Sequence, residues 1–130
     1  MITAILLASA LLTAGEPVTY SALEVVDGDT LRVDGERVRI ANVDTPETQA
    51  GQFECLAEKL LGDLATERAK TLIASGAVVI WPEGRADAYR RPLVRVMVDG
   101  VDWLDAMGPK HAVKWEGKQA DWCGPVNDTT

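Results

Sequence analysis

Residues Val25 to Thr48 read V-V-D-G-D-T-L-R-V-D-G-E-R-V-R-I-A-N-V-D-T-P-E-T, and the predicted architecture depends on them most. It contains two runs of strand-forming residues, Thr30 to Asp34 and Glu36 to Val43, which meet at Asp34-Gly35. An Asp-Gly pair between two such runs is a strong signal for a β-hairpin with a tight turn. We therefore expect a hairpin here, with Val18 to Val26 adding a third strand before it.

The hairpin register predicts where the acidic residues of this stretch lie. Closing the tight turn returns Asp27 and Asp29 toward Asp44 and Glu47 at the open end of the hairpin. Four carboxylates on one rim repel each other unless a cation lies among them, and Ca²⁺ prefers carboxylate, carbonyl and water oxygens. Arg39 is close enough in sequence to serve the same rim, so the pattern indicates a metal site beside a guanidinium, which suits phosphate chemistry.

The residues after the hairpin predict one long helix. Pro46 interrupts the strand pattern and leaves the carbonyl of Thr45 free to face a ligand. Leucines then recur at helical spacing between Glu54 and Ser75, and Gly76 is placed to end the helix. We expect this helix to bury one stripe against the sheet, with Leu56, Leu60, Leu61, Leu64, Ala65, Leu72 and Ile73 at the spacing of such a stripe.

The second half of the chain predicts two more strands and a short helix. The strands are expected at Val78 to Trp81 and Leu93 to Val98, with an arginine-rich loop between them that contains Pro82, Gly84 and Pro92. A short helix is expected from Asp102 to Met107. The fold class is therefore α+β and mainly β: a five-stranded OB-fold barrel, with a long helix after strand 3 and a short helix near the C-terminus.

Length and composition bound the domain organisation. The 130 residues suit one domain with its own core. Residues 1–15 carry no charged side chain and contain an apolar run too short to span a bilayer, so we expect a signal peptide before a single domain at 16–130. The basic start of a signal peptide is missing, which leaves a buried first strand or a membrane-tethering tail as alternatives. The expected mature protein is a secreted or periplasmic monomer without a membrane anchor or a stable protein partner.

The charge of the chain excludes one class of nucleic-acid binder. The formal net charge is −7, whereas proteins that coat nucleic acids accumulate Lys and Arg. Any phosphate binding must therefore be local. Arg85, Arg90, Arg91 and Arg95 cluster around Tyr89 and could supply it, although solvated loops would show the same pattern.

Three motifs in order carry a family resemblance: V-D-G-D-T at Val26 to Thr30, V-R-I-A-N-V-D-T-P-E-T at Val38 to Thr48, and D-A-Y-R-R-P-L at Asp87 to Leu93. With the long helix between the last two, the chain resembles the thermonuclease (staphylococcal nuclease-like) family over roughly Tyr20 to Met107. The resemblance implies an OB-fold and Ca²⁺-dependent hydrolysis of phosphodiester bonds in DNA and RNA, with 3′-phosphate products.

The resemblance also implies roles for single residues. Asp29, Asp44 and the backbone carbonyl of Thr45 would bind the metal, with Asp27 as a further acid behind them. Glu47 would lie beside the attacking water. The phosphate-binding arginines would be Arg39 and Arg91, and Tyr89 would neighbour the bound nucleotide.

Two departures from the family bear on substrate affinity. Ala88 stands where members that bind nucleotide tightly often carry a lysine, and the tyrosines expected after the last helices have no clear counterpart, with Trp115 as the nearest substitute. A non-catalytic module that binds nucleic acid or protein therefore stays open as an alternative. A Ca²⁺-stabilised structural or adhesion domain is a third reading, but it would not need the arginines.

The two cysteines, Cys55 and Cys123, lack the spacing of a metal motif. An oxidising compartment would allow them to pair. Such a disulfide would attach the weakly patterned C-terminal segment to the start of the long helix.

Overall fold

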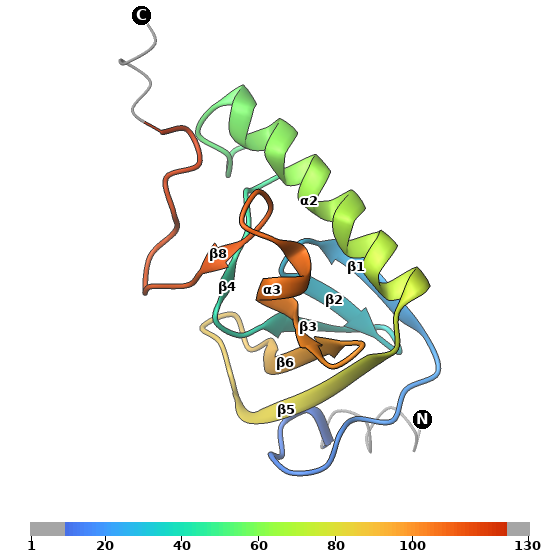
Figure 1. Ribbon diagram of the computed structural model, residues 1–130. Coiled ribbons are helices and arrows are strands. Elements are labelled where there is room, and N and C mark those ends of the chain that lie inside the picture. Colours follow the sequence, from blue (N-terminus) through green and yellow to red (C-terminus); the bar gives the residue numbers. More distant parts are fainter. Residues whose placement is uncertain (1–9, 125–130) are drawn as a thin grey trace, which may run out of the picture.

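The computed structural model describes residues 10–124 as a curved β-sheet covered by one long helix (Figure 1). The strands are β1 (Leu23–Asp27), β2 (Thr30–Val33), β3 (Glu36–Ile40), β4 (Val43–Asp44), β5 (Val78–Ala86), β6 (Pro92–Val98), β7 (Val101–Asp102) and β8 (Val113–Lys114). The helices are α2 (Leu56–Ser75) and α3 (Trp103–Met107). The mainly-β α+β class expected from the sequence is confirmed, and no helix within 10–124 is long and apolar enough to cross a membrane.

The predicted hairpin is present with its turn at Asp34-Gly35. Strands β2 and β3 pair antiparallel from Val33–Glu36 at the turn to Thr30–Arg39 at the open end. Both turn residues have positive φ, as this tight turn requires. The strand before the hairpin begins at Leu23 rather than at Val18, and β1 pairs antiparallel with β2.

The main sheet has the order β1-β2-β3-β6-β5, and β7 adds to the end of β6. These five strands correspond to the five that the sequence predicts. The total in the described residues is eight, because β4, β7 and β8 are short additions of two residues each. No ladder joins the outer strands β1 and β5 there, so the expected barrel is not closed.

Strand β5 is longer than predicted and takes in part of the arginine-rich segment. It runs through Pro82 and Gly84 to Ala86, where the sequence predicts a loop. An edge strand tolerates a proline because the missing N–H would face away from the ladder. The loop is therefore only the short connection before Pro92, and it contains Tyr89 and Arg91.

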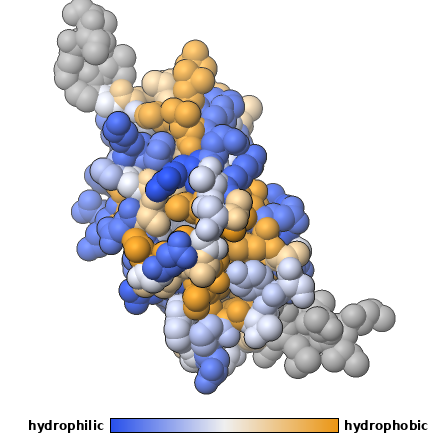
Figure 2. All heavy atoms as spheres, turned by 45° about the vertical axis from the view of Figure 1, so that its right-hand side comes forward, coloured by the Kyte–Doolittle hydropathy of each residue, from blue (hydrophilic) through white to orange (hydrophobic). Residues whose placement is uncertain are grey.

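The long helix is confirmed, and its predicted stripe is buried only in part. Ala65 and Leu72 are buried as expected, and Leu61 and Ile73 are partly buried. Leu56, Leu60 and Leu64 are 69%, 56% and 57% exposed, which contradicts their expected burial. The buried stripe also includes Glu58, Gly62 and Ala69, which the sequence does not predict. Its small residues let the helix backbone lie close to the structure beneath it, and the three exposed leucines lie among charged residues on the outer side. Figure 2, with the α2 side turned forward, shows hydrophobic and hydrophilic side chains intermixed on that face.

The core lies between the sheet, α2 and α3. Its largest fully buried side chain is Trp103, and Leu31, Ile40 and Ile80 are buried with it. Leu11, from the predicted signal peptide, also packs in this cluster. Residues 1–9 of that segment lie outside the described residues, so the signal peptide stays a prediction.

Candidate active site

One open cleft of about 1090 Å³ runs along the end of the hairpin. Strands β1 and β3, the segment after β4, the loop before β6 and the C-terminal segment all contribute to its wall. The charged side chains that line it are the acids Asp27, Asp29, Asp44, Glu47 and Asp87 and the arginines Arg37, Arg39, Arg85 and Arg91. The acidic residues that the hairpin register predicts on one rim therefore lie on one cleft.

The turn between β1 and β2 holds Asp27 and Asp29 against the segment after β4. A Cβ at Gly28 would lie 2.8 Å from a methyl carbon of Thr45, so only glycine allows these two segments to approach so closely. The indole N–H of Trp103, in α3, donates to the Gly28 carbonyl at 2.9 Å and holds this turn against the core. Trp103 is fully buried, and its anchoring role has no signal in the sequence.

Asp29 is buried and has a partner for each carboxylate oxygen. Thr30 donates its hydroxyl to Oδ1 at 3.0 Å, and Arg39 Nη2 lies 3.4 Å from Oδ2. A further Arg39 N–H donates to the Ile40 carbonyl, so the guanidinium is fixed beside the acidic rim rather than in the hydrophobic core. This places the predicted phosphate-binding arginine directly next to a predicted metal carboxylate.

Asp27 and Glu47 have raised pKa values, to which neighbouring acids contribute. Burial raises the pKa of Asp27 to about 7, and the charges of Asp29 and Glu47 add to this increase. Burial also raises the pKa of Glu47, and the nearby charges of Asp29, Glu58 and Asp44 act in the same direction, while Arg39 opposes them. These couplings show that carboxylates far apart in sequence crowd one small volume.

Asp44 is only 3% exposed and lies at the end of β4. Burial raises its pKa and the charge of Asp29 adds to this, whereas the Ala120 N–H, Arg39 and the Trp122 indole lower it. The Ala120 N–H donates to Asp44 Oδ2 at 2.6 Å. The neighbouring Thr45 is buried and is not among the residues that line the cleft.

The loop before β6 brings a second guanidinium to the same rim. Asp87 accepts from the backbone N–H and from Nε of Arg91, at 2.8 and 2.7 Å. Arg91 Nη1 then reaches the hydroxyl of Thr30 at 3.4 Å, one residue from Asp29. Tyr89 is 82% exposed and lines the cleft. The Cζ atom of Arg91 lies over the Tyr89 ring, 5.5 Å from the centre of that ring. The sequence names Arg91 and Tyr89 but not Asp87, which positions both.

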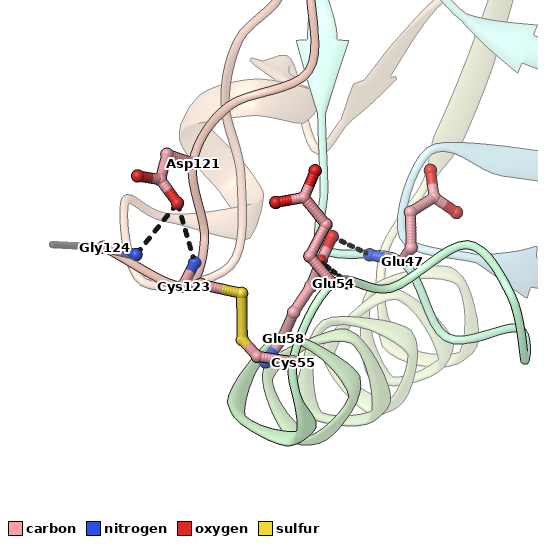
Figure 3. Close-up of a disulfide and its surroundings, with 7 residues drawn as sticks. All are labelled: Glu47, Glu54, Cys55, Glu58, Asp121, Cys123 and Gly124. Atoms are coloured by element: carbon pink, nitrogen blue, oxygen red, sulfur yellow. Dashed lines mark hydrogen bonds between the residues drawn. A yellow bond between two sulfur atoms is a disulfide. The ribbon is translucent and has the colours of Figure 1, made fainter. Parts of the chain in front are cut away.

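Glu47 is held in place by the start of α2. Its backbone N–H donates to Glu58 Oε2 at 3.1 Å, and the Glu54 N–H donates to Glu58 Oε1 at 2.7 Å (Figure 3). Glu58 is only 3% exposed, so these two donors compensate for burying its charge. Sequence reasoning missed Glu58, although an acidic residue three positions after a helix cap is a known signal for such backbone contacts.

Gly62, one turn further along α2, lets the Glu47 segment rest on the helix. A Cβ there would lie 2.7 Å from the Pro46 carbonyl oxygen and 2.9 Å from that of Glu47. Both contacts involve backbone atoms, which cannot rotate away. Gly62 is therefore required by this close approach, and Glu47 depends on it for its position.

The C-terminal segment reaches the same cleft and is attached by a disulfide. Cys55 and Cys123 are bonded, 68 residues apart, and Figure 3 shows this bond at the start of α2. Gln119 Nε2 donates to Glu47 Oε1 at 2.9 Å. Nothing in the composition of this segment signals the contact.

The donor chemistry of the rim fits a hard cation. Within residues 10–124 there is no group of three or more His, Cys, Asp or Glu side chains arranged to hold a metal. The predicted set needs only two, Asp29 and Asp44, with one carbonyl and water. Both carboxylates are buried, and the charge of Asp29 raises the pKa of Asp44, so a cation between them would relieve their repulsion.

Comparison with known proteins places this site in a family. The family model described as staphylococcal nuclease homologue matches residues 37–111, more than half of the chain. The match includes Arg39, Asp44, Glu47 and Arg91, while Asp29 precedes it. The comparison with curated proteins gives no match. With the fold and the motif order in agreement, the chain belongs to the staphylococcal nuclease homologue family.

Proposed function

We propose that this protein is a secreted or periplasmic Ca²⁺-dependent nuclease that hydrolyses phosphodiester bonds of DNA and RNA and leaves 3′-phosphate products. Membership of the family suits a nuclease-like or nucleic-acid-binding function. The observation that carries the catalytic proposal is that Arg39, Arg91 and Glu47 line one cleft with Asp29 and Asp44. The disulfide supports an oxidising compartment.

Each group has a role that its chemistry suits. Asp29, Asp44 and the Thr45 carbonyl would hold Ca²⁺, which supplies Lewis-acid and templating chemistry to the bound phosphate when present. Arg39 and Arg91 bind phosphoryl oxygens, because a planar guanidinium can hold two oxygens at once.

Glu47 accepts a proton from the attacking water. The water oxygen bonds to phosphorus and the bond to the 5′-oxygen breaks with its electron pair on that oxygen. The 5′-oxygen takes up a proton from solvent, and the proton on Glu47 returns to solvent, which leaves a 3′-phosphate and a 5′-hydroxyl. Glu47 is half-buried, and its raised pKa favours proton acceptance near neutral pH. Tyr89 is exposed beside Arg91 and offers a surface for the sugar or base.

Digestion of plasmid DNA and of RNA, with Ca²⁺ and then with a chelator, tests this proposal. We expect cleavage only with Ca²⁺. Arg39→Lys keeps the charge but loses the planar fork, so kcat should fall on the order of 10²- to 10³-fold, as for other preorganised donors. Arg32→Lys, on the adjacent strand and paired with Glu24 outside the cleft, is the matched control that should keep the wild-type rate.

The same assay separates the alternatives. A module that only binds nucleic acid would retard DNA on a gel without cutting it. Glu47→Ala should leave stabilisation by Ca²⁺ largely intact while cleavage falls. Wild-type turnover in both Arg39→Lys and Glu47→Ala would refute the catalytic assignment.

A further inference from the structure

The segment Trp115–Gly124 lies beyond the residues that the family model matches, yet it forms one wall of the cleft. It follows β8, which pairs with β4 so that Val113 is opposite Asp44. The Trp115 N–H then donates to the Asn42 carbonyl at 3.1 Å. This pairing directs the segment across the acidic rim instead of away from it.

Two N–H groups of this segment donate to the site carboxylates. The Ala120 N–H donates to Asp44 at 2.6 Å and the Gln119 amide donates to Glu47 at 2.9 Å. Asp44 is buried and Glu47 is half-buried. The segment therefore presents donors to two acids that have little or only partial access to solvent.

The disulfide joins this segment to the same structure that fixes the backbone of Glu47. Cys55 caps α2, and its sulfur accepts from the Glu58 N–H at 3.4 Å. Glu58 in turn accepts from the Glu47 N–H. Figure 3 shows both sides of this arrangement, with the disulfide at the helix start and Glu58 directed at Glu47. Glu47 is thus held through its backbone by α2 and through its side chain by Gln119.

We propose that Gln119 and Ala120 are positioning residues of this cleft and that the Cys55–Cys123 disulfide keeps them in place, so that turnover depends on the redox state of this cysteine pair. The inference rests on the proposed function. Hydrogen bonds to metal-binding and catalytic carboxylates orient them, and removing such partners typically lowers activity about 10- to 100-fold. The contact of Gln119 with Glu47 is exposed to solvent, so it needs the covalent attachment to persist.

The first test removes each contact in the oxidised protein. Gln119→Ala deletes the side-chain donor, and Ala120→Pro deletes the backbone N–H. Each should lower kcat for DNA cleavage about 10- to 100-fold with little change in KM. Glu116→Gln, at an exposed residue of the same segment, is the control for substitution there and should keep the wild-type kcat.

The second test removes the attachment. A dithiol reductant gives two electrons and two protons to the disulfide and closes to its own cyclic disulfide. The Cys55→Ser/Cys123→Ser variant lacks the disulfide without any reductant. Both should lower kcat to a similar extent. Reduction of Gln119→Ala/Ala120→Pro should then add little, because the contacts that it would release are already absent. A merely structural disulfide would instead show independent effects.

Hydrogen–deuterium exchange of residues 44–48 gives a readout apart from activity, and reduction should speed exchange there. An unchanged or increased kcat after reduction of an active wild type would overturn the inference, whatever the exchange shows. If the oxidised wild type fails to cleave DNA and RNA with Ca²⁺, the proposed function fails instead. Exchange then decides this inference alone: faster exchange supports the positioning role and unchanged exchange refutes it.

Discussion

Gly62→Ala should damage the active site from the helix side. In a free helix this substitution stabilises by about 1 kcal/mol, because alanine has the higher helix propensity. Here the added methyl group would meet the Pro46 and Glu47 carbonyl oxygens at 2.7 and 2.9 Å. The helix and the segment that carries Glu47 must therefore separate.

The size of the effect follows from these distances. Moving the Pro46 oxygen from 2.7 Å to an ordinary contact at 3.4 Å needs a shift of about 0.7 Å. Overpacking of this kind typically costs about 1–3 kcal/mol, which exceeds or cancels the gain in propensity. Because a misplacement of about 1 Å can reduce turnover about 10²-fold, we expect kcat to fall at least about tenfold.

Urea unfolding and DNA cleavage together measure both effects. Glu67→Ala and Glu67→Gly, at an exposed position within the same helix, give the difference between alanine and glycine without a steric term. Gly62→Ala should fall short of that difference by the cost of overpacking. If it gains the full difference in the free energy of unfolding and retains kcat, the proposed support of Glu47 by Gly62 is wrong.

Three further predictions concern charge and covalent attachment. Without Ca²⁺, the free energy of unfolding should fall as pH rises from about 4 to about 7, because the raised pKa values of Asp27 and Glu47 let the folded state bind more protons than the unfolded state. Ca²⁺ should restore stability most at the upper end of this pH range. Equal urea midpoints at pH 5 and pH 8 in the presence of chelator would contradict this prediction. Burial raises the pKa of Asp87, but its hydrogen bonds and ion pair with Arg91 outweigh this and lower it, so its stabilisation is present above its unfolded pKa of 3.8 and is lost as pH falls through the lower folded value. Asp87→Asn should therefore destabilise at pH 7 and flatten the acid limb of a stability–pH profile, and an unchanged acid limb would argue against this role. Cys55→Ser/Cys123→Ser should lower the free energy of unfolding by about 4 kcal/mol in the chain-entropy model, which denaturation without reductant can check; a loss below about 1 kcal/mol would show that the reduced chain retains the segment.

The parts of this structure that could be predicted are those with local signals. Asp34-Gly35 defines the hairpin register. That register brings the acids just before the first strand of the hairpin close to those just after its second strand. Gly76 ends α2 as predicted, and α3 begins one residue after the predicted start at Asp102, which caps it. In each case a few neighbouring residues determine the backbone conformation.

The parts that could not be predicted depend on contacts between distant segments. Periodicity alone cannot tell exactly which stripe of α2 is buried. Leu72 is buried as predicted, but Leu56, Leu60 and Leu64 are exposed, because the close approach at Gly62 turns the glycine and alanine side of the helix inward. The burial of Glu58 is not predictable from its neighbours in α2. A buried carboxylate needs hydrogen-bond donors, and one of its donors, the Glu47 N–H, comes from the segment before the helix. The contact of Gln119 spans 72 residues and has no sequence signal.

The attachment of Gln119 through Cys123 has a consequence for the cell that makes this protein. Gln119 leaves the ribosome after every other residue that lines the cleft, and its anchor at Cys123 cannot form in a thiol-rich cytosol. On the proposed function, a newly made chain would therefore cleave about 10- to 100-fold more slowly until it reaches an oxidising environment. The DNA and RNA of the producing cell would then meet a weaker enzyme during synthesis than the one that is released.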